Sequence, residues 1–265
     1  MQGKEVKRVI EIRNETQESA EIYLSGNIVD DETGGLISMF YDNDTGYQWP
    51  EKTRKQLDGL RGKDLTIYIN SDGGSVPAGV AMANMIARHD GHTTAIVEGW
   101  CCSIATQIFF SADTRKIPTN AYLMIHKPAV WSTGGNADDL RKEADVLDII
   151  QQGLEAVYKK AALAHVTDDE IRTMVDRETW LTGTQAAQFF DVETVEAANI
   201  AACIGSTKRM KNIPVNLHAV PETETAAVCH PAAGQDDKEK RRIDAVKDGK
   251  ARAEIAVALA KGAMI

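Results

Sequence analysis

Short apolar runs alternate with segments of helical period through the first two hundred residues. Four of the runs are brief, rich in β-branched or aromatic residues and bounded by Gly, Asp or Pro, which predicts strands at 21–29, 65–71, 93–99 and 121–127. Segments 76–89 and 103–112 lie between these runs and have the spacing of helices. Strand–helix–strand alternation implies parallel pairing with right-handed crossovers, so we predict an α/β architecture.

Residues 137–165 form the longest periodic segment. Apolar side chains recur there every seven residues, at Leu140, Leu147, Leu154 and Ala161. Charged side chains occupy the other faces. The pattern predicts one long helix whose apolar stripe packs on its own domain or, alternatively, projects and packs against a second subunit. Residues 167–190 then predict a helix that begins at a Thr/Asp cap, an aromatic-bearing turn and a further helix.

The character of the chain changes after about residue 200. Segment 212–235 holds three prolines and little periodicity, which is typical of a linker or a loosely ordered segment. Segment 236–265 mixes opposite charges at helical spacing. We therefore predict one domain over 1–200 and, over 201–265, a linker with a charged helical tail that is scaffold-like or partly disordered.

Composition narrows the function classes. The most apolar stretch, around 94–112, is interrupted by Glu98 and Gln107, so no membrane span is expected. The first residues lack the apolar core of a signal peptide. A net charge of −9 argues against nucleic-acid binding, which depends on basic surface. These features predict a cytoplasmic protein.

The four cysteines do not predict a metal site. They lack CxxC spacing, which fits a reducing compartment without a disulfide framework. The set Cys203, Cys229 and His230 matches no standard zinc spacing. We predict neither a metal nor a cofactor.

Two local features could carry chemistry near the strand ends. The loop 70–75, NSDGGS, follows a predicted strand, and its paired glycines allow positive φ and close approach of another chain, although a tight turn would use them equally well. His126 ends an apolar strand just before Pro128, a position that can face a site or serve packing alone.

The stretch GWCCSIA at 99–105 holds three potential nucleophiles, Cys101, Cys102 and Ser103. It lies where a strand-like run changes to a helix-like one. Ser103 at the start of the predicted helix would lie near free backbone N–H groups, which can stabilise an oxyanion. The alternative is that Ser103 is only a helix N-cap.

Taken together, these motifs resemble the ClpP family, the proteolytic subunit of the Clp protease. Asn70-Ser71-x-Gly73-Gly74, Gly99-x-x-x-Ser103 and Met124-Ile125-His126-x-Pro128 occur in the family's order at compatible separations, within a likeness that runs from about Ile22 to Val195. The spacer 38–62 and the flanks are more similar to ClpP-like proteases of phages and prophages, which cut scaffold or capsid protein during procapsid assembly.

The resemblance implies a crotonase/ClpP-like αβ-superhelix with a projecting handle helix, and a Ser-His-Asp serine endopeptidase. Ser103 would be the nucleophile and His126 its general base, which selects Ser103 over Cys101 and Cys102. The two cysteines then become small packing residues.

Binding roles also follow from the resemblance. The backbone N–H groups of Gly74 and Ile104 would form the oxyanion hole. Substrate would lie extended along Gly73, Ser75 and Val76, with the segment after Gly74 acting as an edge strand.

The third triad residue departs from the family pattern. Counting back from Trp180-Leu181-Thr182 leads to Met174, which cannot orient a histidine. We predict Asp176 for this role, with Asp168 and Asp169 as alternatives on the same helix. A solvated helix carboxylate is the competing interpretation of Asp176.

The predicted function is an ATP-independent head maturation protease, a homo-oligomer that assembles as a ring and cleaves scaffold or capsid proteins in the host cytoplasm or the procapsid. The alternatives are the catalytic subunit of a Clp-type protease with a separate ATPase, a crotonase-type enzyme that stabilises a thioester enolate, and a non-enzymatic capsid assembly protein with a decayed protease fold.

Overall fold

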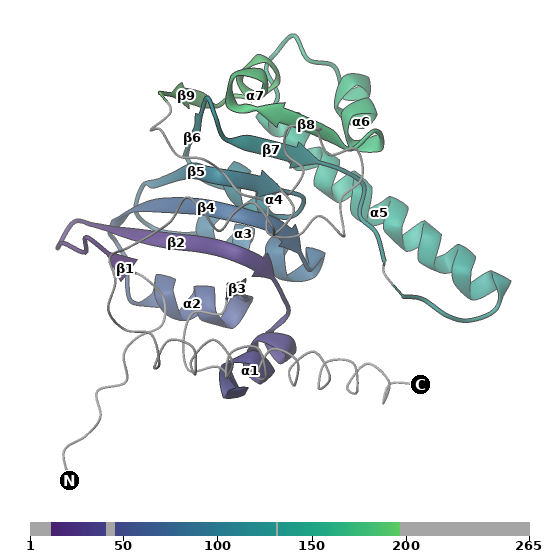
Figure 1. Cartoon of the computed structure of the whole chain (residues 1–265), viewed down its shortest axis with the longest axis horizontal. Coiled ribbons are helices and arrows are strands. Elements are labelled where there is room, and N and C mark those ends of the chain that lie inside the picture. Colours follow the sequence, from purple (N-terminus) through teal and green to yellow (C-terminus); the bar gives the residue numbers. More distant parts are fainter. Residues whose placement is uncertain (1–11, 41–45, 131, 197–265) are drawn as a thin grey trace, which may run out of the picture.

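The computed structural model describes residues 12–40, 46–130 and 132–196, and Figure 1 shows their arrangement around one mostly parallel sheet. The main path of the sheet runs β1-β2-β4-β5-β6-β9, with β3 beside β2, and β7 beside β5 and β8. The strands are β1 Ile12–Arg13, β2 Ser19–Ile28, β3 Tyr47–Gln48, β4 Asp64–Gly74, β5 Thr93–Cys102, β6 Thr114–Pro118, β7 Tyr122–Ile125, β8 Thr179–Thr182 and β9 Glu193–Val195. The helices are α1 Asp31–Phe40, α2 Pro50–Asp58, α3 Val76–Ala87, α4 Ala105–Phe110, α5 Ala137–Ala161, α6 Asp168–Asp176 and α7 Gly183–Phe189. The predicted α/β class is confirmed.

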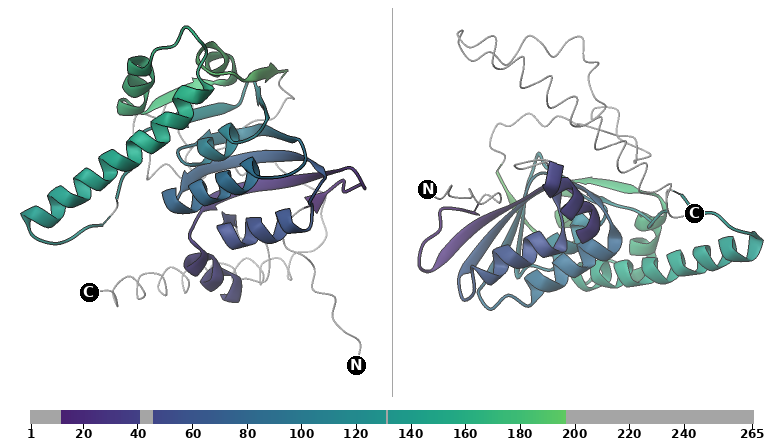
Figure 2. Two further views of the ribbon diagram at one scale, coloured as in Figure 1. Left: turned by 180° about the vertical axis from the view of Figure 1, so that it is seen from behind. Right: turned by 90° about the horizontal axis from the view of Figure 1, so that it is seen from below.

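Strands β2, β4 and β5 are parallel and bury alternate side chains. One face of the sheet carries fully buried residues such as Ile22, Ile67 and Val97, and helices α2, α3 and α4 cover it (Figure 2). On the other face Tyr23 and Tyr68 stack with ring centroids 4.7 Å apart. Burial on the helix-covered face supplies the hydrophobic free energy that fixes the register of these strands.

Strand β5 changes partner along its length. Its first half pairs with β6 and its second half, Trp100 to Cys102, pairs with β7. The change occurs around Gly99, where an added Cβ would lie 3.1 Å from Oδ1 of Asn70; that oxygen accepts the N–H of Trp100. As a result the carboxyl ends of β4, β5 and β7 are neighbours.

The predicted long helix is α5. Asn136 caps it in a capping box with Asp139, and the helix ends at Ala161, four residues before the predicted end, because the next residue is extended and bridges to Phe190. Figures 1 and 2 show its N-terminal half projecting from the rest of the chain.

The two halves of α5 differ in burial. Leu154, Tyr158 and Ala161 are buried in the core, whereas Leu140 and Ile149 are 44% and 67% exposed. Packing within the domain therefore explains the apolar stripe only in the C-terminal half of the helix.

Several regions differ from the sequence-based expectation, which contained no strand at β1, β6 or β9. Residues 31–40 form α1 and residues 47–58 form β3 and α2, where no element was predicted. Residues 179–182 form strand β8 instead of a turn, paired antiparallel with β7. The predictions for 201–265, and the domain boundary at 200, lie outside the described residues. Among the helices of the described ranges, none is long and apolar enough to cross a bilayer.

Candidate active site

The parallel strands β4, β5 and β7 end side by side. Ser71 is in register with Cys101, and Cys102 with Met124. The residues that follow these pairs therefore meet at one edge of the sheet, as the carboxyl ends of parallel strands do. This topology places the glycine loop, Ser103 and His126 together.

Ser103 occupies a strained turn between β5 and α4. Its φ is +55°, a left-handed conformation that is uncommon outside glycine, and its N–H donates to the carbonyl oxygen of Met124 at 2.8 Å. A sharp strand-to-helix turn of this kind presents a serine hydroxyl at the end of a sheet.

The side chains of Ser103 and His126 are in direct contact. Nε2 of His126 lies 2.7 Å from Oγ of Ser103, which is hydrogen-bond distance. Both side chains are partly buried, so they remain accessible to a substrate. The pair has the geometry in which an imidazole can remove the proton of an attacking hydroxyl.

Burial lowers the pKa of His126 below its ordinary value, and the nearby Glu178 carboxylate offsets part of this shift. A lowered pKa keeps the imidazole neutral at neutral pH. The neutral ring can accept a proton at Nε2, so the electrostatics match the requirement for a general base.

Cys101 and Cys102 are fully buried. Burial raises the pKa of both thiols, and a thiol that is not ionised is a poor nucleophile. Their environment therefore fits the packing role expected from the sequence.

The glycine loop approaches the Ser103 turn so closely that side chains are excluded. Gly73 has φ +91°, and a Cβ added there would lie 2.7 Å from Cβ of Ser103 and 3.2 Å from the backbone nitrogen of Ile104. At Gly74, with φ +148°, an added Cβ would lie 2.0 Å from the carbonyl oxygen of Ile28. Only glycine fits either position, and the backbone of Gly73 borders the N–H of Ile104.

The expected edge strand after Gly74 requires correction. Strand β4 ends at Gly74, Ser75 is the N-cap of α3, and Val76 is the first residue of that helix. The N–H of Ser75 donates to the carbonyl oxygen of Ile28 at 2.8 Å. Pro77 at the start of α3 favours helix initiation, so extended backbone is limited to the end of β4.

Asp176 does not contact His126 in the structure. It is the last residue of α6, and its Oδ1 lies 2.9 Å from Nζ of Lys127 and accepts a hydrogen bond from Gln151 at 3.2 Å. The Lys127 ammonium lowers the pKa of this carboxyl. The expected partnership with the histidine is therefore replaced by an ion pair with the neighbouring lysine.

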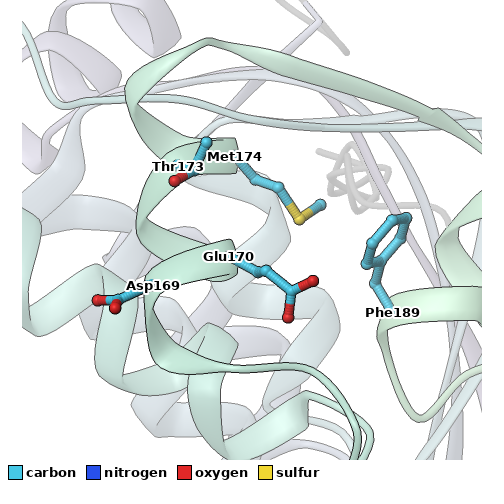
Figure 3. Close-up of a pocket in the computed structure, with 5 residues that line it drawn as sticks. All are labelled: Asp169, Glu170, Thr173, Met174 and Phe189. Atoms are coloured by element: carbon cyan, nitrogen blue, oxygen red, sulfur yellow. The ribbon is translucent and has the colours of Figure 1, made fainter.

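The two alternative carboxylates lie in the first turn of α6, whereas Asp176 is the last residue of that helix. Asp168 lies 3.5 Å from Nζ of Lys159. Asp169 borders a shallow hollow of about 270 Å³ between α6 and α7, and Figure 3 shows its carboxylate directed away from Met174 and Phe189, which line the same hollow.

The carboxylate that does approach the histidine belongs to Glu178. Its Oε2 lies 3.9 Å from Nδ1 of His126. Sequence reasoning missed this residue because it treated 180–182 as a turn. Recognising β8 as a strand paired with β7 would have placed Glu178 beside His126.

Comparisons with known proteins agree with this geometry. A protein-family model described as Clp protease matches residues 51–197. ATP-dependent Clp protease proteolytic subunit 1 of Leifsonia xyli subsp. xyli is 29% identical over 149 residues, which cover 55% of this chain and 74% of the relative. The protein of the same name from Streptomyces avermitilis is 27% identical over 150 residues, 56% of this chain and 68% of the relative.

A solved structure has the same fold. A ClpP1 mutant from Listeria monocytogenes superimposes with a TM-score of 0.52 at 21% identity, over 67% of this chain and 91% of that one. The predicted ClpP-like fold is thereby confirmed.

Proposed function

The chain belongs to the Clp protease family and is a serine-type endopeptidase, and we propose that it cleaves peptide bonds with Ser103 as nucleophile and His126 as general base. The observation that carries this assignment is the 2.7 Å contact between Nε2 of His126 and Oγ of Ser103. The strained backbone of Ser103 and the lowered pKa of His126 support it.

The proposed reaction has two halves. As Oγ of Ser103 bonds to the scissile carbonyl carbon, its proton passes to Nε2 of His126; the imidazolium then protonates the leaving amine as the carbon–nitrogen bond breaks. In the second half, His126 deprotonates a water molecule that attacks the ester carbon, and the proton returns to Oγ of Ser103 as the acid product leaves. The proton transfers in both halves involve only this pair, the substrate and water.

The backbone around Ser103 supplies the remaining parts of the proposal. The N–H groups of Gly74 and Ile104 stabilise the oxyanion, and loss of one such donor typically costs about 10²–10³ in rate. A substrate would lie extended beside Gly73, with main-chain pairing at the end of β4, whereas Ser75 and Val76 belong to the start of α3. Such pairing accepts many sequences.

Cleavage of an unfolded polypeptide carrying a quenched fluorophore tests this function. We expect a signal from the wild type that is lost in Ser103→Ala and His126→Ala. Asp169→Asn, in the first turn of α6 beside the hollow between α6 and α7, serves as the matched control and should keep wild-type cleavage. A Ser103→Ala variant as active as the wild type would contradict the assignment.

For the biological process, we propose head maturation: ATP-independent cleavage of scaffold or capsid proteins by a homo-oligomeric ring, in the host cytoplasm or the procapsid. The likeness of spacer 38–62 to phage proteases supports this role. The exposed N-terminal half of α5, with Leu140, Val146 and Ile149, supports subunit contact. Sedimentation velocity tests the ring, since a monomer at micromolar concentration would contradict it.

The second candidate is the catalytic subunit of a protease with a separate ATPase, which is favoured by the words "ATP-dependent" in the names of both relatives. Co-expression with the neighbouring genes, with and without an ATPase-inactivating substitution in any ATPase among them, separates the two. Ser103-dependent cleavage of a capsid or scaffold protein without ATP hydrolysis supports head maturation. Cleavage that requires ATP hydrolysis supports the second candidate, and a folded wild type that cleaves nothing supports a decayed protease.

A further inference from the structure

The β7–β8 ladder brings Glu178 to His126. The strands are antiparallel, and their last pair is Ile125 opposite Thr179. One step further along the same register, His126 is opposite Glu178. Opposite residues of an antiparallel pair have Cβ atoms about 4.5–5.5 Å apart, so the two side chains are neighbours by construction.

The imidazole of His126 lies between a hydroxyl and a carboxylate. Nε2 faces Oγ of Ser103 at 2.7 Å, and Nδ1 faces Oε2 of Glu178 at 3.9 Å. If Nε2 accepts the serine proton, Nδ1 carries the ring hydrogen and points it at the carboxylate. A separation of 3.9 Å is an electrostatic contact rather than a hydrogen bond, and such contacts often shorten when substrate binds.

Glu178 is held in a costly state. Its backbone has φ +51°, its side chain is only 10% exposed, and its Oε1 is buried without a hydrogen-bond partner among the described residues. Strained backbone and a buried carboxylate each oppose folding. Both features occur on the residue whose carboxylate faces Nδ1 of His126, so an electrostatic role at the histidine gives a reason for keeping them.

Asp176 has a different environment. It is solvent-exposed, and its ion pair with Lys127 and hydrogen bond from Gln151 tie α6 to α5 and to the segment after β7. The charge of Asp176 is therefore neutralised by Lys127 in a surface ion pair next to the site.

We propose that Glu178, in place of Asp176, is the positioning residue that holds His126 in the productive tautomer and stabilises the imidazolium that forms during the reaction. Glutamate fills this position in some serine hydrolases. The proposal rests on the function proposed above, because His126 needs orienting only if it acts as the base.

The first test compares Glu178→Gln with Asp176→Asn by the rate at which a fluorophosphonate labels Ser103. Each substitution removes one carboxylate charge and keeps the side-chain shape. We expect Glu178→Gln to slow labelling by at least about 100-fold, since loss of the corresponding carboxylate elsewhere costs about 10⁴. Asp176→Asn should stay within about threefold of the wild type.

A second readout does not depend on activity. The titration of His126, followed by NMR and assigned with His126→Gln, should move to lower pH in Glu178→Gln, because removal of a negative charge disfavours the imidazolium. The same titration should not move in Asp176→Asn, whose carboxylate is paired with Lys127. Other polar and charged groups around the site are Ser103, Cys102, Asp72, Lys127 and Gln151.

The two readouts separate the claims. A folded wild type that is not labelled at Ser103 overturns the proposed function, and the titration still tests the contact. Wild-type labelling and an unshifted titration in Glu178→Gln, or an equal loss in Asp176→Asn, overturn the role of Glu178. If Glu178→Gln does not fold, Glu178→Asp replaces it. The retained charge should keep the titration of His126 near that of the wild type, while the shorter side chain should lower the rate at which Ser103 is labelled. An unchanged labelling rate in Glu178→Asp overturns the proposal.

Discussion

Gly73 lies so close to Ser103 that a methyl group on Gly73 would be 2.7 Å from Cβ of Ser103. This close approach joins the end of β4 to the turn after β5. The position of the serine hydroxyl therefore depends on a residue that has no side chain.

Gly73→Ala should displace the Ser103 turn. Its φ of +91° costs an alanine roughly 1–3 kcal/mol before the steric overlap is counted, and we expect labelling of Ser103 to fall at least about tenfold. Gly35→Ala is the control, because a Cβ there meets nothing within 4 Å in helix α1, where alanine should add about 0.5–1 kcal/mol of stability. Urea unfolding and labelling rates measure both; a Gly73→Ala variant with wild-type labelling would refute the dependence.

The strain at Ser103 predicts that glycine is the better replacement there. Ser103→Gly and Ser103→Ala both lose the hydroxyl and its contact with His126, but only glycine adopts φ +55° freely. We expect the glycine variant to have a higher urea midpoint than the alanine variant. Its free energy of unfolding should be larger by about 0.5–1 kcal/mol, with the larger unfolded-state entropy of glycine included. Equal midpoints would show that the turn relaxes without glycine.

Tyr158 braces the nucleophile turn from α5. Its hydroxyl lies 2.7 Å from Oγ1 of Thr106, which donates to the carbonyl oxygen of Ser103. Because Thr106 has one hydroxyl hydrogen, Tyr158 must be the donor between them, and burial raises its pKa to about 12, which keeps that proton in place. Tyr158→Phe should lower the free energy of unfolding by about 1–2 kcal/mol and slow labelling.

The control for this bond is a double-mutant cycle with Thr106→Val. If the hydroxyls act through each other, the two single losses will not add in the double variant. If the losses in the free energy of unfolding are additive, the Tyr158 hydroxyl does not act through Thr106, and the effect of Tyr158→Phe comes from packing.

The lowered pKa of His126 sets the direction of the pH dependence. Labelling requires the neutral imidazole, so the rate should rise with pH along an acid limb whose midpoint lies below about 6.5, the ordinary histidine value. The same shift makes His126 stabilise the fold fully above the unfolded-state pKa and lose that contribution as pH falls to the folded-state pKa. Labelling rates between about pH 4.5 and 9 measure the limb, and a midpoint above 7 would contradict the desolvated environment.

The sequence predicts the parts of this structure that depend on local pattern. The apolar runs of β2, β4, β5 and β7 and the period of α5 are visible in the chain, because burial of one face imposes alternation or helical spacing. Ser103 and His126 follow two of those runs directly, so the resemblance and the strand ends lead to the same two residues.

The sequence pattern does not identify Glu178 as the acidic residue beside His126. A count back from Trp180 fixes a sequence distance, whereas the contact with His126 depends on strand register and on a left-handed φ at Glu178. Neither the register of the four-residue strand β8 nor the left-handed φ of Glu178 can be recognised from the sequence pattern. The elements α1, β3 and α2 were not predicted because their sequences show no clear periodicity.

The central claim is that Ser103 is an activated nucleophile. Intact-mass spectrometry after treatment with a fluorophosphonate tests it most directly, with the adduct located by peptide mapping. The account predicts one adduct per reactive chain on the peptide that contains Ser103, none in Ser103→Ala or Ser103→Gly, and strongly slowed labelling in His126→Ala. A correctly folded wild type that stays unlabelled, or an adduct at any other residue, would contradict it.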